Sequence, residues 1–93
     1  MKNLQGLLAF VETAASGSLS AAAARLDLTP AAVSKSVAKL EEQLGVRLFN
    51  RSTRRLALTH EGGRFLADAR AALRLLDEAV AGVTQSARTP AGR

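Results

Sequence analysis

The segment 28–45, LTPAAVSKSVAKLEEQLG, constrains the fold of this chain most strongly. Thr29 is suited to cap a helix, and Pro30 is suited to its first position, where the backbone needs no N–H. Gly45 follows the last turn and tolerates the left-handed conformation of a helix end. Between these signals, apolar residues recur with spacings of four, three and four: Val33, Val37, Leu40 and Leu44. The pattern predicts a helix over 30–44 with one buried face.

Two more helices are predicted before this one. The first covers 3–15 and ends at Ser16-Gly17; one buried stripe is expected to consist of Leu4, Leu7, Leu8, Val11 and Ala15. Ser18 is suited to cap the second, whose narrow apolar face consists of Leu19, Ala22, Ala23 and Leu26. Asp27-Leu28 then makes a tight connection to the helix over 30–44. Because its face is largely alanine, the second helix can be approached closely.

Beyond Gly45 the periodicity changes. The short segments VRLF and RLAL favour β-strands, and the polar, basic segment NRSTR joins them. We therefore expect a two-stranded hairpin with an arginine-rich tip.

A last helix is expected from Thr59, as its cap, to about Gln85. Its apolar positions are spaced alternately by three and four, as in a coiled-coil seam: Leu66, Ala69, Leu73, Leu76, Val80 and Val83. The final SARTPAGR is small and polar, like a linker. The expected division is a head over 1–58, a linker or dimerisation helix over 59–86, and a flexible tail over 87–93.

Positive charge is concentrated in one part of the chain. The 93 residues include 13 lysines and arginines against 8 acidic residues, a net charge of +5. Six basic and two acidic residues lie within 29–58, so this segment carries +4 of the total. Such a balance favours phosphate-rich partners or anionic membrane surfaces. On a helical wheel, the face opposite the buried stripe holds Ala31, Lys35, Ala38 and Lys39. Small and basic side chains on that face suit entry into a DNA major groove.

Several functional classes are disfavoured by composition. The chain has no cysteine, which excludes a disulfide framework and a thiolate zinc site. Its single histidine, His60, has no nearby ligand partner, and we expect it to be exposed in the first turn of the last helix. The hydroxyl residues lack a His/Asp partner set, so no catalytic site is predicted. Glu12 and Arg25 interrupt the longest apolar tracts, so no membrane span is expected.

Together these features predict a mainly α fold: a winged helix-turn-helix of three helices and a two-stranded wing, followed by a long dimerisation helix. One alternative is a membrane-surface or partner-binding module built on the last helix. That helix is slightly acidic, whereas interfacial helices favour a basic polar face. An RNA-binding domain is a second alternative, weakened because the three aromatic residues, Phe10, Phe49 and Phe65, occupy apolar positions instead of exposed stacking positions.

The segments GSLSAAAARL, TPAAVSKSVAKLEEQLGVRLFNR and LALTHEG, in this order, resemble the N-terminal DNA-binding domain of LysR-type transcriptional regulators over residues 2–86. The resemblance implies a bacterial, cytoplasmic regulator that binds double-stranded DNA sequence-specifically. It also implies a homodimer through the last helix, placed on an interrupted palindrome. In similar proteins an effector-binding domain follows and tetramers form. The resemblance thus implies that 1–58 is the DNA-binding domain and that 87–93 is a flexible tail or hinge to an absent effector domain. This chain is therefore expected to be an excised or truncated head, without cofactor or small-molecule effector.

The resemblance also suggests where DNA is contacted. The family's contacts fall at the start of the recognition helix, the start of the preceding helix and the wing tip. With the neighbouring polar and basic residues, the predicted DNA-binding set is Ser18, Ser20, Thr29, Pro30, Ala31, Ser34, Lys35, Lys39, Arg51, Thr53, Arg54 and Arg55. Many members have Gln-Pro where this chain has Pro30-Ala31, so an amide that could bind adenine is missing here.

Overall fold

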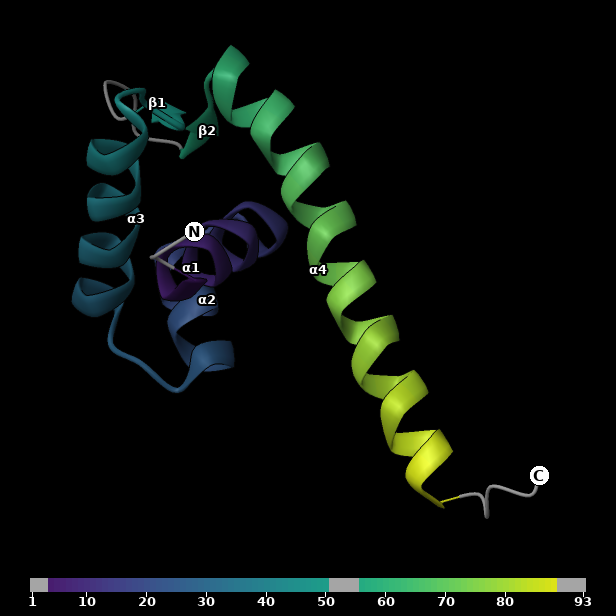
Figure 1. The fold of residues 1–93 in the computed structure, drawn as a ribbon. Coiled ribbons are helices and arrows are strands. Elements are labelled where there is room, and N and C mark those ends of the chain that lie inside the picture. The colour runs from purple at the N-terminus through teal and green to yellow at the C-terminus, as the bar shows by residue number, and fades with distance from the viewer. Residues whose placement is uncertain (1–3, 51–55, 89–93) are drawn as a thin grey trace.

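The computed structural model describes residues 4–50 and 56–88 (Figure 1). Three helices come first: α1 (Leu4–Ser16), α2 (Leu19–Leu26) and α3 (Pro30–Leu44). Two short strands follow, β1 (Phe49–Asn50) and β2 (Ala57–Leu58), paired antiparallel with Phe49 opposite Leu58. A long helix, α4 (His60–Arg88), completes the fold. The predicted winged helix-turn-helix with a long last helix is confirmed; below, "the head" means α1, α2, α3, β1 and β2.

The helix ends are fixed by local hydrogen bonds, as the sequence predicts. Ser18 Oγ accepts a bond of 2.9 Å from the backbone N–H of Ala21, and Thr29 Oγ1 accepts one of 3.1 Å from Ala32. Each hydroxyl thereby satisfies one of the free N–H groups at a helix start. At the end of α3, Gly45 has a φ of 75° and its N–H donates to the Glu41 carbonyl at 2.8 Å.

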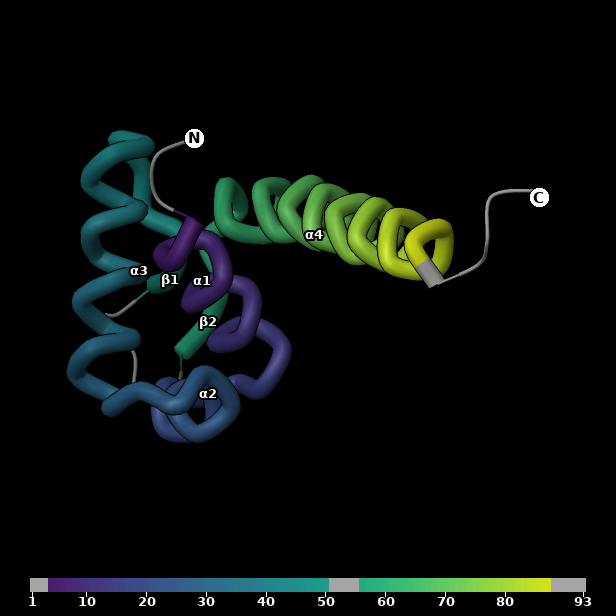
Figure 2. Tube along the Cα trace, turned by 60° about the horizontal axis from the view of Figure 1, so that its bottom comes forward, coloured from purple at the N-terminus to yellow at the C-terminus, as the bar shows by residue number. Residues whose placement is uncertain are grey.

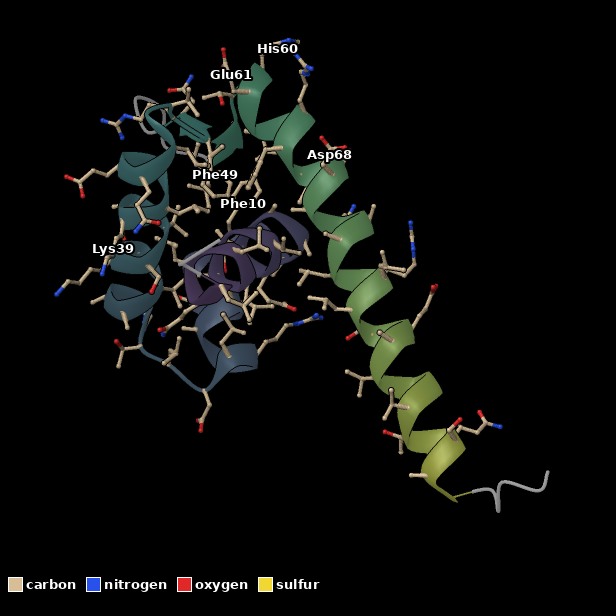
Figure 3. All side chains as sticks on the ribbon, in the orientation of Figure 1. Phe10, Lys39, Phe49, His60, Glu61 and Asp68 are labelled. Atoms are coloured by element: carbon tan, nitrogen blue, oxygen red, sulfur yellow. The ribbon has the colours of Figure 1, made fainter. Side chains whose placement is uncertain are left out.

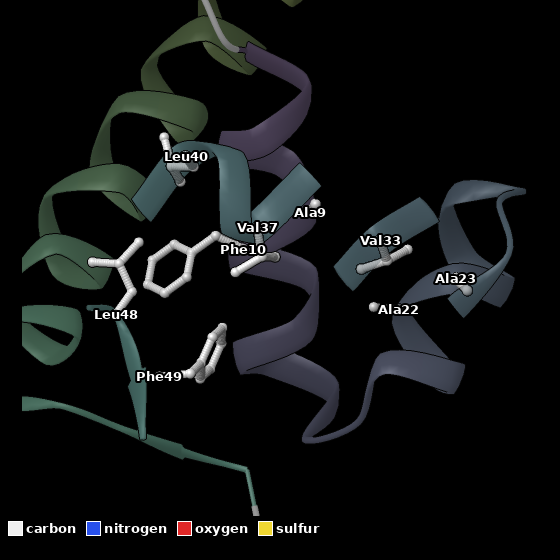
Figure 4. Packing of buried hydrophobic residues seen from close by; sticks show 9 residues of the cluster. All are labelled: Ala9, Phe10, Ala22, Ala23, Val33, Val37, Leu40, Leu48 and Phe49. Atoms are coloured by element: carbon white, nitrogen blue, oxygen red, sulfur yellow. The ribbon is translucent and has the colours of Figure 1, made fainter. Parts of the chain in front are cut away.

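The core of the head is centred on Phe10 of α1 (Figure 4). The Phe10 ring lies 5.4 Å from the Phe49 ring of β1 and 5.5 Å from the Phe65 ring of α4, both tilted. Ala22 and Ala23 of α2 are buried against the other helices, which confirms the close approach expected of an alanine face. The buried cluster comprises Ala9, Phe10, Ala22, Ala23, Val33, Val37, Leu40, Leu48 and Phe49.

Several sequence expectations need correction. Leu44 was expected in the core but is 41% exposed, because the chain turns back at Gly45 and Leu48 becomes the buried residue beside Leu40. The expected four-residue strands are reduced to the two-residue β1 and β2. α4 continues to Arg88, three residues past the expected end, since no helix breaker precedes Pro90. α1 ends at Ser16, one residue later than expected. Its expected buried stripe is wrong except at Leu7 and the half-buried Val11: Leu4, Leu8 and Ala15 are exposed. The buried face instead consists of Gly6, Leu7, Ala9, Phe10 and Thr13, because α2, α3 and α4 pack around Phe10.

α4 begins against the head and then leaves it, as Figures 1 and 2 show from two directions. The whole structure extends 58 Å along its longest axis and only 25 and 21 Å along the others. Near the head, Ala69 is buried and Leu66 packs against the core. Among the described residues, no helix is long and apolar enough to cross a membrane.

Candidate nucleic-acid interface

The outward face of α3 is built from small and basic side chains. Ala31, Lys35, Ala38 and Lys39 are all exposed, on the side of the helix opposite the buried Val33 and Val37. Figure 3 shows Lys39 pointing away from the head. Ser34 is half-buried at the edge of this face, and Pro30 is exposed at its N-terminal end. The structure thus brings the α3 part of the predicted site together on one accessible face.

The starts of α2 and α3 also carry exposed hydroxyl groups. Ser18, Ser20 and Thr29 are exposed, and the Ser18 and Thr29 oxygens already accept capping bonds. Their O–H groups can still donate to an anion, and the helix starts carry partial positive charge. The two helices are joined tightly, since the Leu28 N–H donates to the Ala23 carbonyl at 2.9 Å. Phosphate oxygens are the ligands that hydroxyl groups at a helix start favour.

The predicted wing contacts Arg51, Thr53, Arg54 and Arg55 lie outside the described residues, so their role stays a prediction. The stem that carries them is described: Asn50 pairs with Ala57 across β1 and β2. Beside it, Arg47 has a side chain that is 70% exposed. Arg47 also lines a shallow groove along α3 with Lys35, Ala38 and Lys39.

Glu41 holds the wing stem onto α3, a role that the sequence analysis did not assign. Its side chain is only 6% exposed, and Oε2 accepts bonds from the backbone N–H groups of Leu48 at 2.8 Å and Phe49 at 3.1 Å. The Arg47 guanidinium lies 4.0 Å from Oε1. A carboxylate that accepts two backbone N–H bonds is a strong local tether. The signal was available, because Glu41 lies four residues after Val37 on the buried stripe.

Thr59 joins the wing to α4. Its hydroxyl donates to the Arg47 carbonyl at 2.6 Å and accepts from the Gly62 N–H at 2.9 Å, which confirms it as the cap of α4. Its backbone N–H donates to the Leu48 carbonyl at 3.0 Å. His60 and Glu61, labelled in Figure 3, are exposed in the first turn, as expected for His60. The Glu61 carboxylate complements the positive end of the helix.

The predicted dimerisation residues fall into two groups. Ala69 is 4% exposed and Leu66 and Leu73 are half-buried, so the first half of the seam is covered within the chain. Leu76, Val80 and Val83 are 52%, 65% and 71% exposed. These last three form an apolar stripe beyond the head with no covering in a single chain.

In the part of the chain that the structure describes, no group of three or more His, Cys, Asp or Glu side chains could hold a metal ion. Two open grooves lie on the surface: one runs beside α3, and another lies between α3 and α4, lined in part by Leu44, Val46 and Phe65.

A helix-turn-helix with a wing stem and a basic, small-residue face on its second helix defines a DNA-binding class of protein. The family model described as "Bacterial regulatory helix-turn-helix protein, lysR family" matches residues 4–63. The chain belongs to this LysR family.

Individual relatives and structures agree with that assignment. A transcriptional repressor of Pseudomonas aeruginosa is 41% identical over 93 residues, and the regulator CrgA of Neisseria meningitidis is 46% identical over 83 residues, 89% of this chain. The chain spans 29% and 27% of their lengths. The BenM DNA-binding domain in complex with benA site 1 DNA superposes with a TM-score of 0.84 at 31% identity, covering 90% of this chain and 94% of that one. A CbnR DNA-binding domain–DNA complex gives 0.78 at 35% identity, covering 89% and 95%.

Proposed function

We propose that this chain binds double-stranded DNA sequence-specifically, as the DNA-binding head of a LysR-type transcriptional regulator in the bacterial cytoplasm, and that it catalyses no reaction. The observation that carries the proposal is the exposed face of α3, where Ala31 and Ala38 leave room for base edges and Lys35 and Lys39 supply charge. The likeness to BenM and CbnR domains that were crystallised with DNA supports it.

Within this proposal the residues of the predicted DNA-binding set have different roles. Ala31 and Ser34, near the start of α3, contact base edges in the major groove. Ser18, Ser20 and Thr29 bind phosphates at the two helix starts, and Lys35 and Lys39 neutralise the flanking backbone. The wing residues Arg51, Thr53, Arg54 and Arg55 reach the adjacent minor groove and its phosphates.

The proposed functional unit is a homodimer formed through α4, with its two heads on an interrupted palindrome. The exposed stripe of Leu76, Val80 and Val83 supports this, because a helix that projects from a small head has nothing else to cover it. In a full-length chain with an effector domain, two such dimers can assemble as a tetramer.

The test is selection of bound sequences from a random duplex library, followed by footprinting of the selected site. We expect two enriched half-sites related by a dyad. The double variant Lys35→Ala/Lys39→Ala should lose most binding, whereas Arg70→Ala/Arg74→Ala, which removes the same charge from exposed positions on α4, should retain it. Failure to enrich any motif, together with binding to anionic liposomes, would favour the membrane-surface alternative instead.

A further inference from the structure

The start of α4 approaches the wing so closely that only glycine fits at one position. Gly62 is buried, and a Cβ placed on it would collide with the backbone carbonyl of Leu48. The neighbouring Gly63 lies in the same helical turn, and a Cβ placed there meets nothing within 4 Å. The two glycines therefore have different structural roles: the first permits backbone contact between α4 and the wing, and the second does not.

Leu48 is the point where three elements meet. Its N–H is held by the Glu41 carboxylate of α3 at 2.8 Å, and its carbonyl accepts the Thr59 N–H at 3.0 Å. The same carbonyl lies against Gly62, and the Leu48 side chain is fully buried. Backbone atoms under this many constraints cannot shift independently of their neighbours. The direction in which α4 leaves the head is thus tied to the recognition helix at Leu48, in addition to the packing of Phe65, Leu66 and Ala69 against the head.

We propose that the contact between Gly62 and Leu48 sets the angle between α3 and α4 and thereby the separation of the two DNA half-sites that a dimer prefers. This inference rests on the proposed function, because only a dimer through α4 converts that angle into a spacing. Gly62 is a positioning residue in this account: it touches no DNA and acts through the placement of the head.

The expected size of the effect follows from helix geometry. A Cβ at position 62 must displace the helix start by about 1 Å to restore ordinary contact with the carbonyl. With the buried Ala69 as pivot, roughly 10 Å along the axis, this tilts α4 by about 6°. At Val80, roughly 16 Å beyond the pivot, the tilt moves the helix by about 1.6 Å, and two-fold symmetry doubles the change between heads to about 3 Å. Successive base pairs are about 3.4 Å apart and are rotated by about 35° from one another. A displacement of this size should therefore change the relative affinity of the dimer for spacers that differ by one base pair.

The decisive experiment compares Gly62→Ala with Gly63→Ala, which add the same methyl group and gain the same helix propensity in the same turn. Each variant is offered a duplex library in which two copies of the selected half-site are separated by spacers of every length. We expect Gly62→Ala to change its relative affinity for spacers one base pair shorter or longer than the wild-type optimum, while its affinity for a single half-site stays within about twofold of wild type. Gly63→Ala should keep the wild-type spacing.

A second measurement needs no DNA. The chain has no cysteine, so Ala24→Cys on the exposed surface of α2 gives one spin label per head. The distance between the two labels in the dimer should change by about 3 Å in Gly62→Ala and remain unchanged in Gly63→Ala. If Gly62→Ala does not fold, Thr59→Val carries both measurements: it removes the bonds to Arg47 and Gly62, and we expect it to broaden the distance distribution, with Thr59→Ser restoring it.

The outcomes separate the two proposals. A folded Gly62→Ala variant with the wild-type spacer preference and the wild-type distance between labels overturns the positioning role of Gly62. Where Thr59→Val is used instead, a distance distribution as narrow as that of wild type overturns it. If the wild-type protein itself shows neither a preferred spacer length nor a measurable distance between two spin labels, it does not form the proposed dimer, and the proposed function is wrong whatever the role of Gly62.

Discussion

The two halves of α4 share the same apolar spacing and have opposite surroundings. In the first half, Ala69 is 4% exposed and Leu66 packs against the core around Phe10; in the second, Leu76 and Val83 are 52% and 71% exposed. A helical stripe thus tells which face of a helix is apolar and leaves open what covers it. The first half is covered by the head of the same chain, and the second half is exposed in the single chain; we propose that a second copy covers it.

The largest expected effect separates these halves. Ala69→Asp buries an unpaired charge against the head and should destabilise folding by about 3 kcal/mol or more. Leu76→Asp lies on the exposed half and should leave the head folded while abolishing the dimer. Thermal unfolding followed by circular dichroism measures the first effect, and sedimentation at micromolar concentration measures the second.

The contrast between the two halves of α4 is wrong if Ala69→Asp and Leu76→Asp have the same effect. A Leu76→Asp protein that still sediments as a dimer would remove the exposed half of α4 from the interface. A suitable control is Asp77→Ala, which changes the adjacent residue on the polar side of the helix and should preserve both folding and dimerisation.

The salt dependence of DNA affinity tests whether the exposed half of α4 brings two heads onto one DNA duplex. A dimer whose heads together neutralise six or more phosphates should lose about a thousandfold in affinity between 50 and 200 mM salt. The monomeric Leu76→Asp head, bound to a single half-site, should show about half that salt slope. Fluorescence anisotropy titrations at several salt concentrations give both slopes. Equal slopes would mean that the wild-type protein engages DNA through one head only.

A smaller effect is expected inside the head, where stability does not depend on the partner. Glu41→Leu leaves the N–H groups of Leu48 and Phe49 without their acceptor and should cost about 2–4 kcal/mol. In a protein of this size that lowers the unfolding temperature by roughly 10 °C or more. Glu41→Gln should retain most of the stability, because one oxygen accepts both bonds and an amide oxygen can take its place. Equal melting temperatures for the two variants would show that the tether does not hold the wing.

Local features were predictable from the sequence, because their causes lie within a few residues. Ser18, Thr29 and Thr59 cap their helices, and Gly45 ends α3, as their side chains and positions indicated. The charge segregation and the exposed face of α3 likewise followed from spacing alone. These features sufficed to predict the fold class and the centre of the candidate site.

Other features depend on where distant segments return. Glu41 and Leu44 both continue the apolar stripe of α3 at a spacing of four, and periodicity cannot decide which of them is buried. The turn at Gly45 determines which one is buried. It brings the backbone N–H of Leu48 to the Glu41 carboxylate, so Glu41 is buried with a hydrogen-bond donor, whereas Leu44 stays exposed. The requirement for glycine at position 62 was likewise not predictable, because it comes from the nearby Leu48 carbonyl and not from the conformation of α4.

The smallest effects should distinguish base recognition from general attraction within one head. Ser34→Ala or Ala31→Gln, at the start of α3, should alter the bases preferred at particular positions by about 1–3 kcal/mol per pair, with little change in salt slope. Arg54→Ala, in the segment outside the described residues, should weaken binding to most sequences, lower the salt slope by about one unit per head and relax any preference for A·T-rich flanks. Binding-site selection on each variant at two salt concentrations makes the comparison. If the α3 variants select the wild-type motif unchanged while Arg54→Ala scrambles its centre, then the wing reads the sequence and α3 merely positions the head, the reverse of the roles proposed here.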